Sequence, residues 1–519
     1  MDDQTFHDDI EGYCGQLSYR VGDTVELHIS TRANLYDVTV ERWGGIRKVV
    51  WSNPAIGGQY FAPPEDADAE GCGWPVGVEF AVDPTWQSGF YLVTMTASGA
   101  EPGREIAHAG FVVRGHEAPA RRRRALYVLP TNTWHAYNTW GGRSLYTGGS
   151  KVSFQRPFCR GLLSRPEVER DDRKARPTRF RETPDIDGTI FQQYRTDHNY
   201  PSAIGSTGWF THGRRFVEWA ERAGYEFDFA VSTDLEDDPS ALDGYEVVVL
   251  VGHDEYWSAP QRDAVERFVA AGGSLASFSG NTMFWQVRVE PGRDGRSMVC
   301  HKYRAHLDDP AVASGRTGEM TGMWADPLVD RPEWTILGAG SAYGLYHRFG
   351  QATARGVGGF VVHRDDHWLL TETDLGYGDV LGVDDGVVGY ETVGCPLTLD
   401  SVGLPVVAAS VSAPMAPDTE IVAFTPSSNL AVGEYPASIA ALSDQGDLEF
   451  NAERIFGGGV DALARARHGN AVMLTCRPFG DDGGEVVTIG TTDWVFGLAE
   501  DPAVGQVTAN VLERFNKRR

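Results

Sequence analysis

The sequence lacks the features that mark disulfide-rich, zinc-binding, secreted and membrane-spanning proteins. No two of its six cysteines have the CxxC spacing of a zinc site or a redox dithiol, and no apolar run reaches the roughly 18 residues of a membrane helix. The N-terminal MDDQTFHDDI has neither the cationic nor the apolar segment of a signal peptide. We therefore expect mostly buried thiols, no membrane association and a cytoplasmic location.

Positive charge is scarce. The chain has 46 lysines and arginines against 72 aspartates and glutamates, a formal net charge of −26. Such a field repels phosphate backbones and anionic lipids, so a nucleic-acid or membrane partner would need a local basic patch. Residues 160–181 have eight basic and four acidic residues with almost no periodicity. We interpret them as a basic inserted surface loop, with anion binding as a minor alternative.

Several familiar catalytic motifs are also missing. The chain has no GxSxG or GxCxG nucleophile elbow, no Walker A loop, no HExxH and no GxGxxG after a strand. These absences disfavour serine hydrolases, thiol amidotransferases, P-loop enzymes and Rossmann dehydrogenases.

The N-terminal part has the pattern of an all-β domain. The 519 residues suffice for several cores, and up to about residue 114 short alternating apolar runs are separated by Gly, Pro, Asp and Asn. We predict an Ig-like β-sandwich over residues 1–116 as an accessory domain. Residues 117–124 end in four arginines and are predicted to be a solvated linker.

From residue 125 the pattern changes to that of an α/β domain. Apolar runs at 125–129, 227–231, 247–251 and 274–278 suit strands covered on both faces, with helical spacing between some of them. This alternation predicts a parallel, three-layer α/β sheet. After about residue 320 short β-like runs return, followed by a last helix near 503–515. The fold class is thus α/β plus all-β, with 125–519 as one domain that has β-rich C-terminal additions.

Polar and aromatic residues follow three of the predicted strands. Gly252 to Trp257 follow the most apolar strand, Ser279 to Thr282 follow the next, and Asn132 to Gly142 follow the first. Ligands bind at the carboxyl ends of strands in such sheets. Each group also has a structural explanation, since Asp254 or Ser258 could cap a helix, Asn281 could hold a turn and Tyr137 could pack in the core. Their coincidence at three strand ends favours a functional crevice.

Five segments together resemble the large (β) subunit of N,N-dimethylformamidase and its relatives. They are residues 136–142, 152–158, 252–258, 280–288 and 490–494. The likeness covers roughly residues 125–515, and the sandwich also looks like the family's. It implies a flavodoxin-like catalytic domain similar to class I glutamine amidotransferases, in which two tyrosines and a glutamate hold a mononuclear iron in place of a catalytic cysteine.

The resemblance also assigns residues. It implies Glu255 as the carboxylate ligand and Tyr137 as one phenolate ligand, with His253 and Asn281 beside the metal. Where relatives commonly read Arg-Pro-Tyr this chain has Phe158, so Tyr194 or Tyr200 is left as the candidate for the second phenolate, or the metal is missing or altered. The extra lectin-like domain of the characterised large subunit is not found, and the family's small subunit is not part of this chain.

The chemistry of these residues is consistent with amide hydrolysis. Phenolate and carboxylate are hard donors suited to Fe3+, which can polarise a carbonyl and lower the pKa of bound water. His253 could then shuttle a proton, and the Asn281 amide could donate to the oxyanion. Our leading hypothesis is a metal-dependent hydrolase of a small amide. Whether the chain forms a homo-oligomer or binds a small partner subunit is left open. The alternative is a non-catalytic carbohydrate-binding or polar-ligand-binding protein that stacks its ligand on tryptophans (Trp134, Trp140, Trp257 and Trp285).

Overall fold

The computed structural model describes residues 9–100, 102–118, 122–166, 200–201, 204–344, 358–408, 414–429, 431, 433–434 and 446–516. The chain divides into two compact units. The first comprises residues 1–166, 199–245 and 287–300, and the second comprises residues 167–198, 246–286 and 301–519. The predicted linker lies within the first unit. Of the predicted basic loop, residues 167–181 lie outside the described residues.

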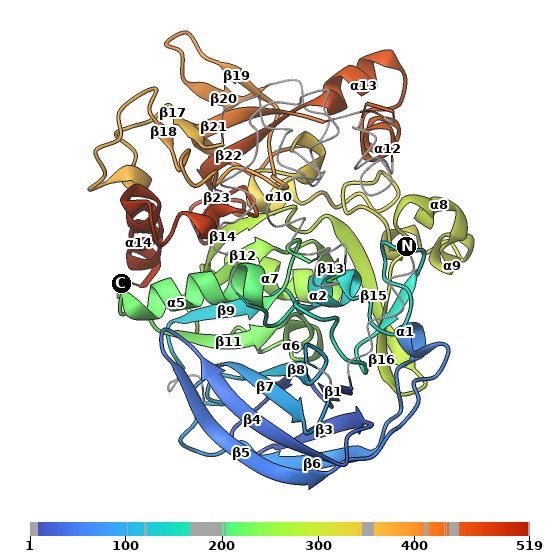
Figure 1. Ribbon diagram of the computed structural model, residues 1–519. Helices are drawn as coiled ribbons and strands as arrows, with labels where there is room; N and C mark the ends of the chain where they lie inside the picture. Colours follow the sequence, from blue (N-terminus) through green and yellow to red (C-terminus); the bar gives the residue numbers. More distant parts are fainter. Residues whose placement is uncertain are drawn as a thin grey trace. The chain divides into compact units, whose positions relative to one another are not determined.

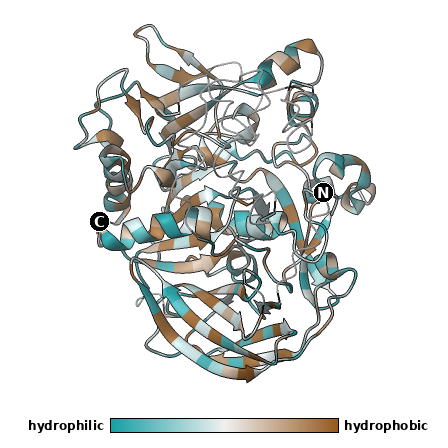
Figure 2. Cartoon of the chain, viewed as in Figure 1, coloured by the Kyte–Doolittle hydropathy of each residue, from teal (hydrophilic) through white to brown (hydrophobic). Residues whose placement is uncertain are grey.

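The first unit contains the predicted N-terminal β-sandwich (Figure 1). One sheet has the strand order β2-β8-β7-β4-β5 and the other the order β1-β3-β6. Buried and exposed side chains alternate along strands such as β3, which Figure 2 shows as alternating colours, and both sheets contribute to one hydrophobic core. The strands are β1 (Ile10–Cys14), β2 (Ser18–Tyr19), β3 (Thr24–Thr31), β4 (Leu35–Trp43), β5 (Arg47–Gly57), β6 (Val76–Ala81), β7 (Gly89–Ala97) and β8 (Ile106–Val113).

The first unit also contains two of the predicted α/β strands and a small antiparallel group. β9 (Ala125–Leu129) pairs in parallel with β11 (Phe227–Val231), as their apolar runs predicted. β16 pairs antiparallel with both β10 and β15. The remaining elements are α1 (Ala67–Glu70), α2 (Thr131–Tyr137), β10 (Lys151–Ser153), α5 (Arg214–Arg222), α6 (Ser232–Asp237), β15 (Trp285–Gly292), whose first two residues belong to the second unit, and β16 (Gly295–Val299).

Two of the linker arginines have specific partners while staying partly exposed. The guanidinium of Arg122 donates to the backbone carbonyls of His116 (2.9 Å) and Asp243 (2.5 Å). Arg123 forms an ion pair with Glu226. A run of four arginines is usually a solvated segment, but here the neighbouring carbonyl and carboxylate groups provide acceptors that the local sequence does not reveal.

The second unit is built on a mixed sheet. β12 (Val247–His253), β14 (Ser274–Gly280) and β23 (Val486–Ile489) are parallel neighbours, and the sheet continues antiparallel through β22 (His468–Cys476), β21 (Glu420–Ser428), β17 (Phe360–Val362) and β18 (Val380–Leu381). The predicted parallel strands at 247–251 and 274–278 are confirmed, and the predicted β-rich C-terminal additions supply the antiparallel part of the same sheet. The nine residues between β22 and β23 are too few for a crossover, so these two strands pair antiparallel.

The other helices and strands of the second unit lie between or after the strands of this sheet along the chain. A short strand and a helix lie between β12 and β14, namely β13 (Tyr256–Ser258) and α7 (Ala259–Ala270). Further helices are α8 (Ala305–Asp308), α9 (Pro310–Ala313), α10 (Trp334–Leu337), α12 (Asp447–Arg454), α13 (Val460–Arg467) and α14 (Pro502–Asn516), and β19 (Leu397–Leu399) pairs with β20 (Pro405–Val407). The last helix matches the predicted one to within a residue at each end.

The pairing of β12 with β14 determines which side chains meet at their carboxyl ends. His253, the last residue of β12, is in register with Gly280, the last residue of β14. A Cβ atom on Gly280 would lie 2.2 Å from the carbonyl oxygen of Glu391 and 2.5 Å from the backbone nitrogen of Thr492. Only glycine permits this close approach, which brings the chain around Glu391 next to the end of β14.

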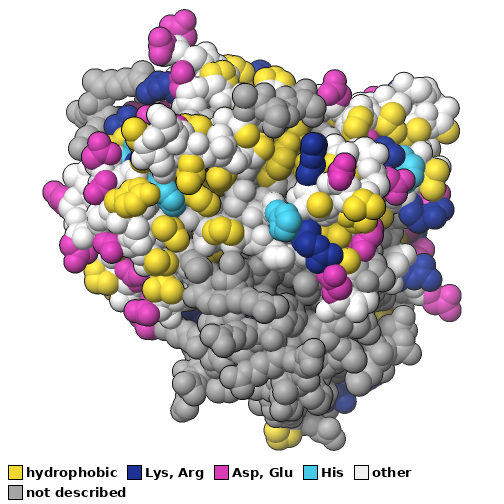
Figure 3. Space-filling view, turned by 90° about the horizontal axis from the view of Figure 1, so that it is seen from above, with side chains coloured by type: hydrophobic (Ala, Val, Ile, Leu, Met, Phe, Trp, Pro, Cys, Tyr) yellow, Lys and Arg dark blue, Asp and Glu magenta, His cyan; other side chains and the backbone are white. Residues whose placement is uncertain are grey.

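The remaining features of the described residues concern the cysteines, the helices and the surface charge. All six cysteines are buried, and none of them forms a disulfide bond. Among the described helices, none combines the length and the apolar character needed to cross a bilayer. In the described part of the face in Figure 3, acidic, basic and apolar side chains are interspersed, and no extended basic patch is visible there.

Candidate active site

The turn after β12 places an imidazole and a carboxylate in the interior. His253 has an exposed fraction of 0% and Glu255 of 3%. The chain enters this turn through Gly252, whose φ of 78° lies in the left-handed region that glycine adopts without strain. It leaves through Ser258, whose hydroxyl oxygen accepts a hydrogen bond from the backbone N–H of Gln261 at the start of α7. Ser258 therefore caps α7, as the alternative to a functional role predicted.

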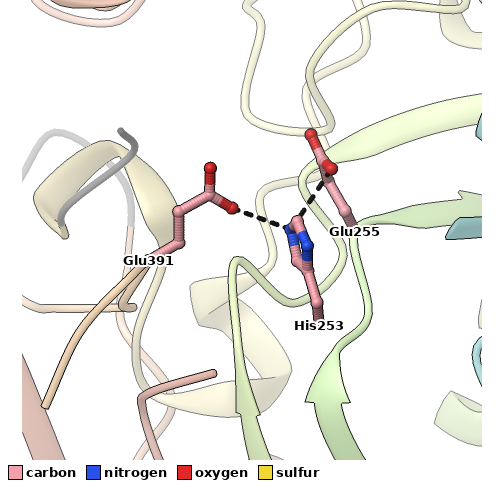
Figure 4. A group of neighbouring side chains, drawn as sticks. All are labelled: His253, Glu255 and Glu391. Carbon is pink, nitrogen blue, oxygen red and sulfur yellow. Dashed lines mark ion pairs between the residues drawn. The ribbon is translucent and has the colours of Figure 1, made fainter. Parts of the chain in front are cut away.

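His253 lies between two carboxylates (Figure 4). Its Nε2 atom is 2.7 Å from Oε2 of Glu391 and 3.2 Å from Oε2 of Glu255. Ligand atoms of these three residues all lie within 4.8 Å of one another. On the other side of the ring, Nδ1 is 3.4 Å from the hydroxyl of Tyr390. The imidazole is thus oriented from both nitrogens.

Asn281 lies at the same edge of the sheet, as predicted. Its Nδ2 atom donates to Oε2 of Glu391 (2.8 Å) and lies 3.4 Å from Nε2 of His253. Asn281 has a φ of 51°, an unusual conformation for a residue other than glycine. Strained backbone of this kind is often retained at functional sites.

Glu391 was not among the predicted site residues. Its loop joins the site because the backbone N–H of Thr492, just after β23, donates to the carbonyl of Glu391, and Thr392 forms a bridge with Thr491. Residues 490–494, which follow β23, are one of the five segments that resemble the family, so the sequence did indicate that the end of β23 is part of the site. The acidic residue comes from a loop about a hundred positions earlier, in a region without a clear periodic pattern, and only the tertiary fold reveals it.

Burial and charge act in opposite directions on His253. Burial lowers its pKa, but Glu391 and Glu255 outweigh that effect and raise the pKa to about 10. Burial raises the pKa of Asp254 to about 7, and the N–H of Trp257, which donates to Oδ1 of Asp254 (2.9 Å), opposes the shift. Asp254 is therefore held by its own turn, whereas Glu255 faces His253.

A phenol and a further carboxyl lie near this cluster. The Tyr303 hydroxyl donates to Oδ1 of Asp447 at 2.5 Å. Burial raises the pKa of Tyr303 well above its usual value, and the charges of Asp447, Glu255 and Glu391 add to the increase. This pair extends the acidic region of the second unit beyond the residues that the sequence suggested.

The predicted tyrosine ligands belong to other parts of the chain. Tyr137 ends α2 in the first unit and its ring is 4.2 Å from that of Tyr146. Tyr200 is a buried residue of the same unit, and Tyr194 lies outside the described residues. The assignment of these tyrosines to a metal site therefore stays a prediction.

Position 158 has a packing role in the structure. The ring of Phe158 lies 4.7 Å from the His135 ring and 6.3 Å from Trp134. The adjacent Arg156 is buried and donates to the carbonyls of Asn138 (3.0 Å) and Trp140. Arg156 thus holds the turn that directly follows Tyr137.

The four tryptophans of the binding-protein alternative do not face solvent. Their exposed fractions lie between 0% and 5% (Trp134, Trp140, Trp257 and Trp285). Stacking on a sugar needs an exposed ring face, so these four buried tryptophans do not provide the stacking surface that this alternative proposed.

The donor set of the second unit fits a metal ion. Two buried carboxylates close together repel each other unless a positive charge compensates them, and either a protonated His253 or a metal ion can supply that charge. Oxygen and imidazole nitrogen donors are suitable ligands for iron, and the group is compact enough to share one ion. The residues whose donor atoms fit a metal ion in this way are His253, Glu255 and Glu391.

A comparison with protein-family models identifies the family of this chain. The chain belongs to the family described as N,N-dimethylformamidase beta subunit-like, C-terminal, whose model matches residues 37–508. The match includes most of the sandwich as well as the whole candidate site.

Two curated relatives share a shorter segment with the chain. The N,N-dimethylformamidase beta subunit of Alcaligenes sp is 36% identical over 76 residues, and that of Paracoccus aminophilus is 34% identical over 76 residues. Each segment covers 14% of this chain and 10% of the relative. The similarity to these two proteins is thus confined to a small part of their length.

Proposed function

We propose that this chain is a metal-dependent hydrolase of C–N bonds in a small amide or formamide, similar to N,N-dimethylformamidase. The observation that carries the proposal is the buried group of His253, Glu255 and Glu391. Membership of the dimethylformamidase-like family supports the same reaction class. The amidotransferase-like arrangement of the catalytic domain, implied by the resemblance, is part of the proposal.

The proposed cofactor is iron, as Fe3+. Glu255 would hold it through a carboxylate oxygen, and the resemblance adds Tyr137 and one further tyrosine, Tyr194 or Tyr200. When bound, such an ion supplies a Lewis acid that polarises the amide carbonyl and acidifies water. Glu391 and His253 lie close to Glu255, and the proposal places them beside the metal rather than among its ligands.

His253 and Glu391 form the proposed proton-transfer pair. Nε2 of His253 lies 2.7 Å from Oε2 of Glu391, so this carboxylate stabilises the imidazolium that forms when a deprotonated Nε2 accepts a proton. In the proposed step the neutral imidazole takes a proton from the attacking water at Nε2 and returns it to the leaving amine, so His253 starts and ends deprotonated at that atom. Asn281 orients Glu391 through one N–H, and its amide has a second N–H to offer to the developing oxyanion.

The test is a combined metal and activity assay. Protein purified without chelators should contain about one iron per chain and release amine or ammonia from formamide, N-methylformamide or N,N-dimethylformamide. Glu255→Ala should lose both iron and turnover. Full activity in metal-free protein would contradict the metal-dependent mechanism.

The assembly of the protein is also part of the proposal. Both curated relatives are named as beta subunits. By analogy, this chain would work as a homo-oligomer or with a small partner subunit, in the cytoplasm. Co-purification of the untagged protein and measurement of its mass in solution would test this.

A further inference from the structure

The two carboxylate oxygens of Glu255 have different partners. Oε2 is the atom near His253, at 3.2 Å from Nε2. Oε1 accepts a hydrogen bond from the indole N–H of Trp285 at 2.7 Å. A free carboxylate can exchange its two oxygens by rotation, but this one is oriented by a neutral donor.

Trp285 is itself held firmly in place. It has an exposed fraction of 1%, and the rings of Phe284, Tyr303 and Phe450 lie 4.6 to 6.0 Å from its ring. Its backbone N–H also donates to the backbone carbonyl of Glu255 at 3.0 Å. Trp285 therefore contacts Glu255 through both its main chain and its side chain.

We infer that Trp285 is a positioning residue for Glu255, and that its indole N–H holds Oε1 so that Oε2 is presented to His253 and to the metal. The inference rests on the proposed function. An indole N–H suits this task because it only donates and carries no charge, so it neither binds the cation nor repels it. Hydrogen bonds of this kind to metal-ligating carboxylates orient the ligand, and their loss typically lowers metal affinity by roughly 10- to 100-fold.

The chain offers a matched control in Trp324. This residue has an exposed fraction of 1%, and its indole N–H has no hydrogen-bond partner among the residues that the structure describes. Trp285→Phe and Trp324→Phe remove the same atoms from two buried sites of the same unit. Only the first removes a hydrogen bond to a carboxylate.

The first experiment tests the hydrogen bond without metal or activity. In ¹H–¹⁵N spectra of the full-length protein, the indole signal that disappears in Trp285→Phe belongs to Trp285. We expect this signal to move upfield in Glu255→Gln, because the neutral amide is a weaker acceptor than the carboxylate. A Trp285 signal at the free-indole position, unmoved by Glu255→Gln, would overturn the inference.

The second experiment tests the positioning role. Iron affinity, measured by competition with a chelator, should fall roughly 10- to 100-fold in Trp285→Phe and stay at the wild-type value in Trp324→Phe. The visible phenolate-to-iron band should also shift in Trp285→Phe alone. Equal iron affinity in Trp285→Phe and wild type, or equal losses in both variants, would overturn the role. If wild-type protein bound no metal, the proposed function would fail, whereas the indole signal would still report on the hydrogen bond.

Discussion

Two buried carboxylates of the second unit, Glu391 and Glu333, have very different surroundings. Glu391 Oε2 accepts from Asn281 and faces Nε2 of His253. Glu333 has an exposed fraction of 0%, its Oε1 accepts from the backbone N–H of Ser341, and its Oε2 has no partner within the described part of the chain. Both sites remove a carboxyl from water, but only the first provides an imidazole and an amide.

The two surroundings have different electrostatic consequences. Burial raises the pKa of Glu391, while His253 and Asn281 oppose the shift. Burial raises the pKa of Glu333 to about 7, and the backbone N–H of Ser341 offsets this only in part. A perturbed carboxyl is therefore not a sufficient sign of a functional site, and the groups that face it decide which reaction it could serve.

The largest expected effect is that of Glu255→Ala. It should lose iron, the visible band and turnover, and the loss should exceed the ~100-fold that removal of an outer partner typically costs. Glu333→Gln is the matched control, because it neutralises an equally buried carboxyl elsewhere in the same unit and should retain iron. Iron content by elemental analysis and amine release measure the two effects.

The next effect separates proton transfer from metal binding. His253→Ala should retain iron while turnover falls by roughly 10²- to 10⁴-fold. Glu391→Gln should behave in the same way, and the double variant should lose little more than either single one, because the two residues act as a pair. Loss of iron from His253→Ala would instead identify His253 as a ligand.

Replacement of the candidate tyrosines should have a spectroscopic effect. Tyr194→Phe or Tyr200→Phe should shift or abolish the visible band if that residue supplies the second phenolate. Phe158→Tyr should strengthen iron binding if position 158 faces the metal, because it adds an anionic oxygen donor. If neither Tyr→Phe variant changes iron content or colour, a compensating tyrosine is ruled out. If Phe158→Tyr changes neither iron affinity nor activity, position 158 does not face the metal.

The smallest expected effect concerns stability at the Glu333 site. The folded-state pKa of about 7 exceeds the ordinary value of 4.5, so the folded protein binds the proton more tightly than the unfolded chain. The free energy of unfolding should therefore fall as pH rises from 4.5 to about 7, by at most roughly 3 kcal/mol. Glu333→Gln should remove this fall and be the more stable form above pH 7 in chemical unfolding. Parallel pH profiles of the two proteins would contradict this assignment.

Much of the local structure could be predicted from the sequence. The alternating runs of the sandwich and the apolar runs of β12 and β14 predicted strands at the right places, since periodicity reflects which faces are buried. His253, Glu255 and Asn281 could be assigned to one edge because they lie at or just after the carboxyl ends of two adjacent parallel strands. The position of β21 and β22 in this sheet, and the partners of Arg122 and Arg123, depended on contacts that no local pattern encodes.

The sequence by itself determined that this chain has a sandwich, a set of buried strands and a histidine–glutamate turn at a strand end. Only the tertiary structure decided that Glu391 joins that turn and that the indole of Trp285 orients Glu255. The physical reason is that strand propensity and periodicity act over a few residues, whereas Glu391 reaches His253 through a close backbone approach at Gly280 and a hydrogen bond to Thr492. Such long-range approaches depend on how the whole sheet is assembled.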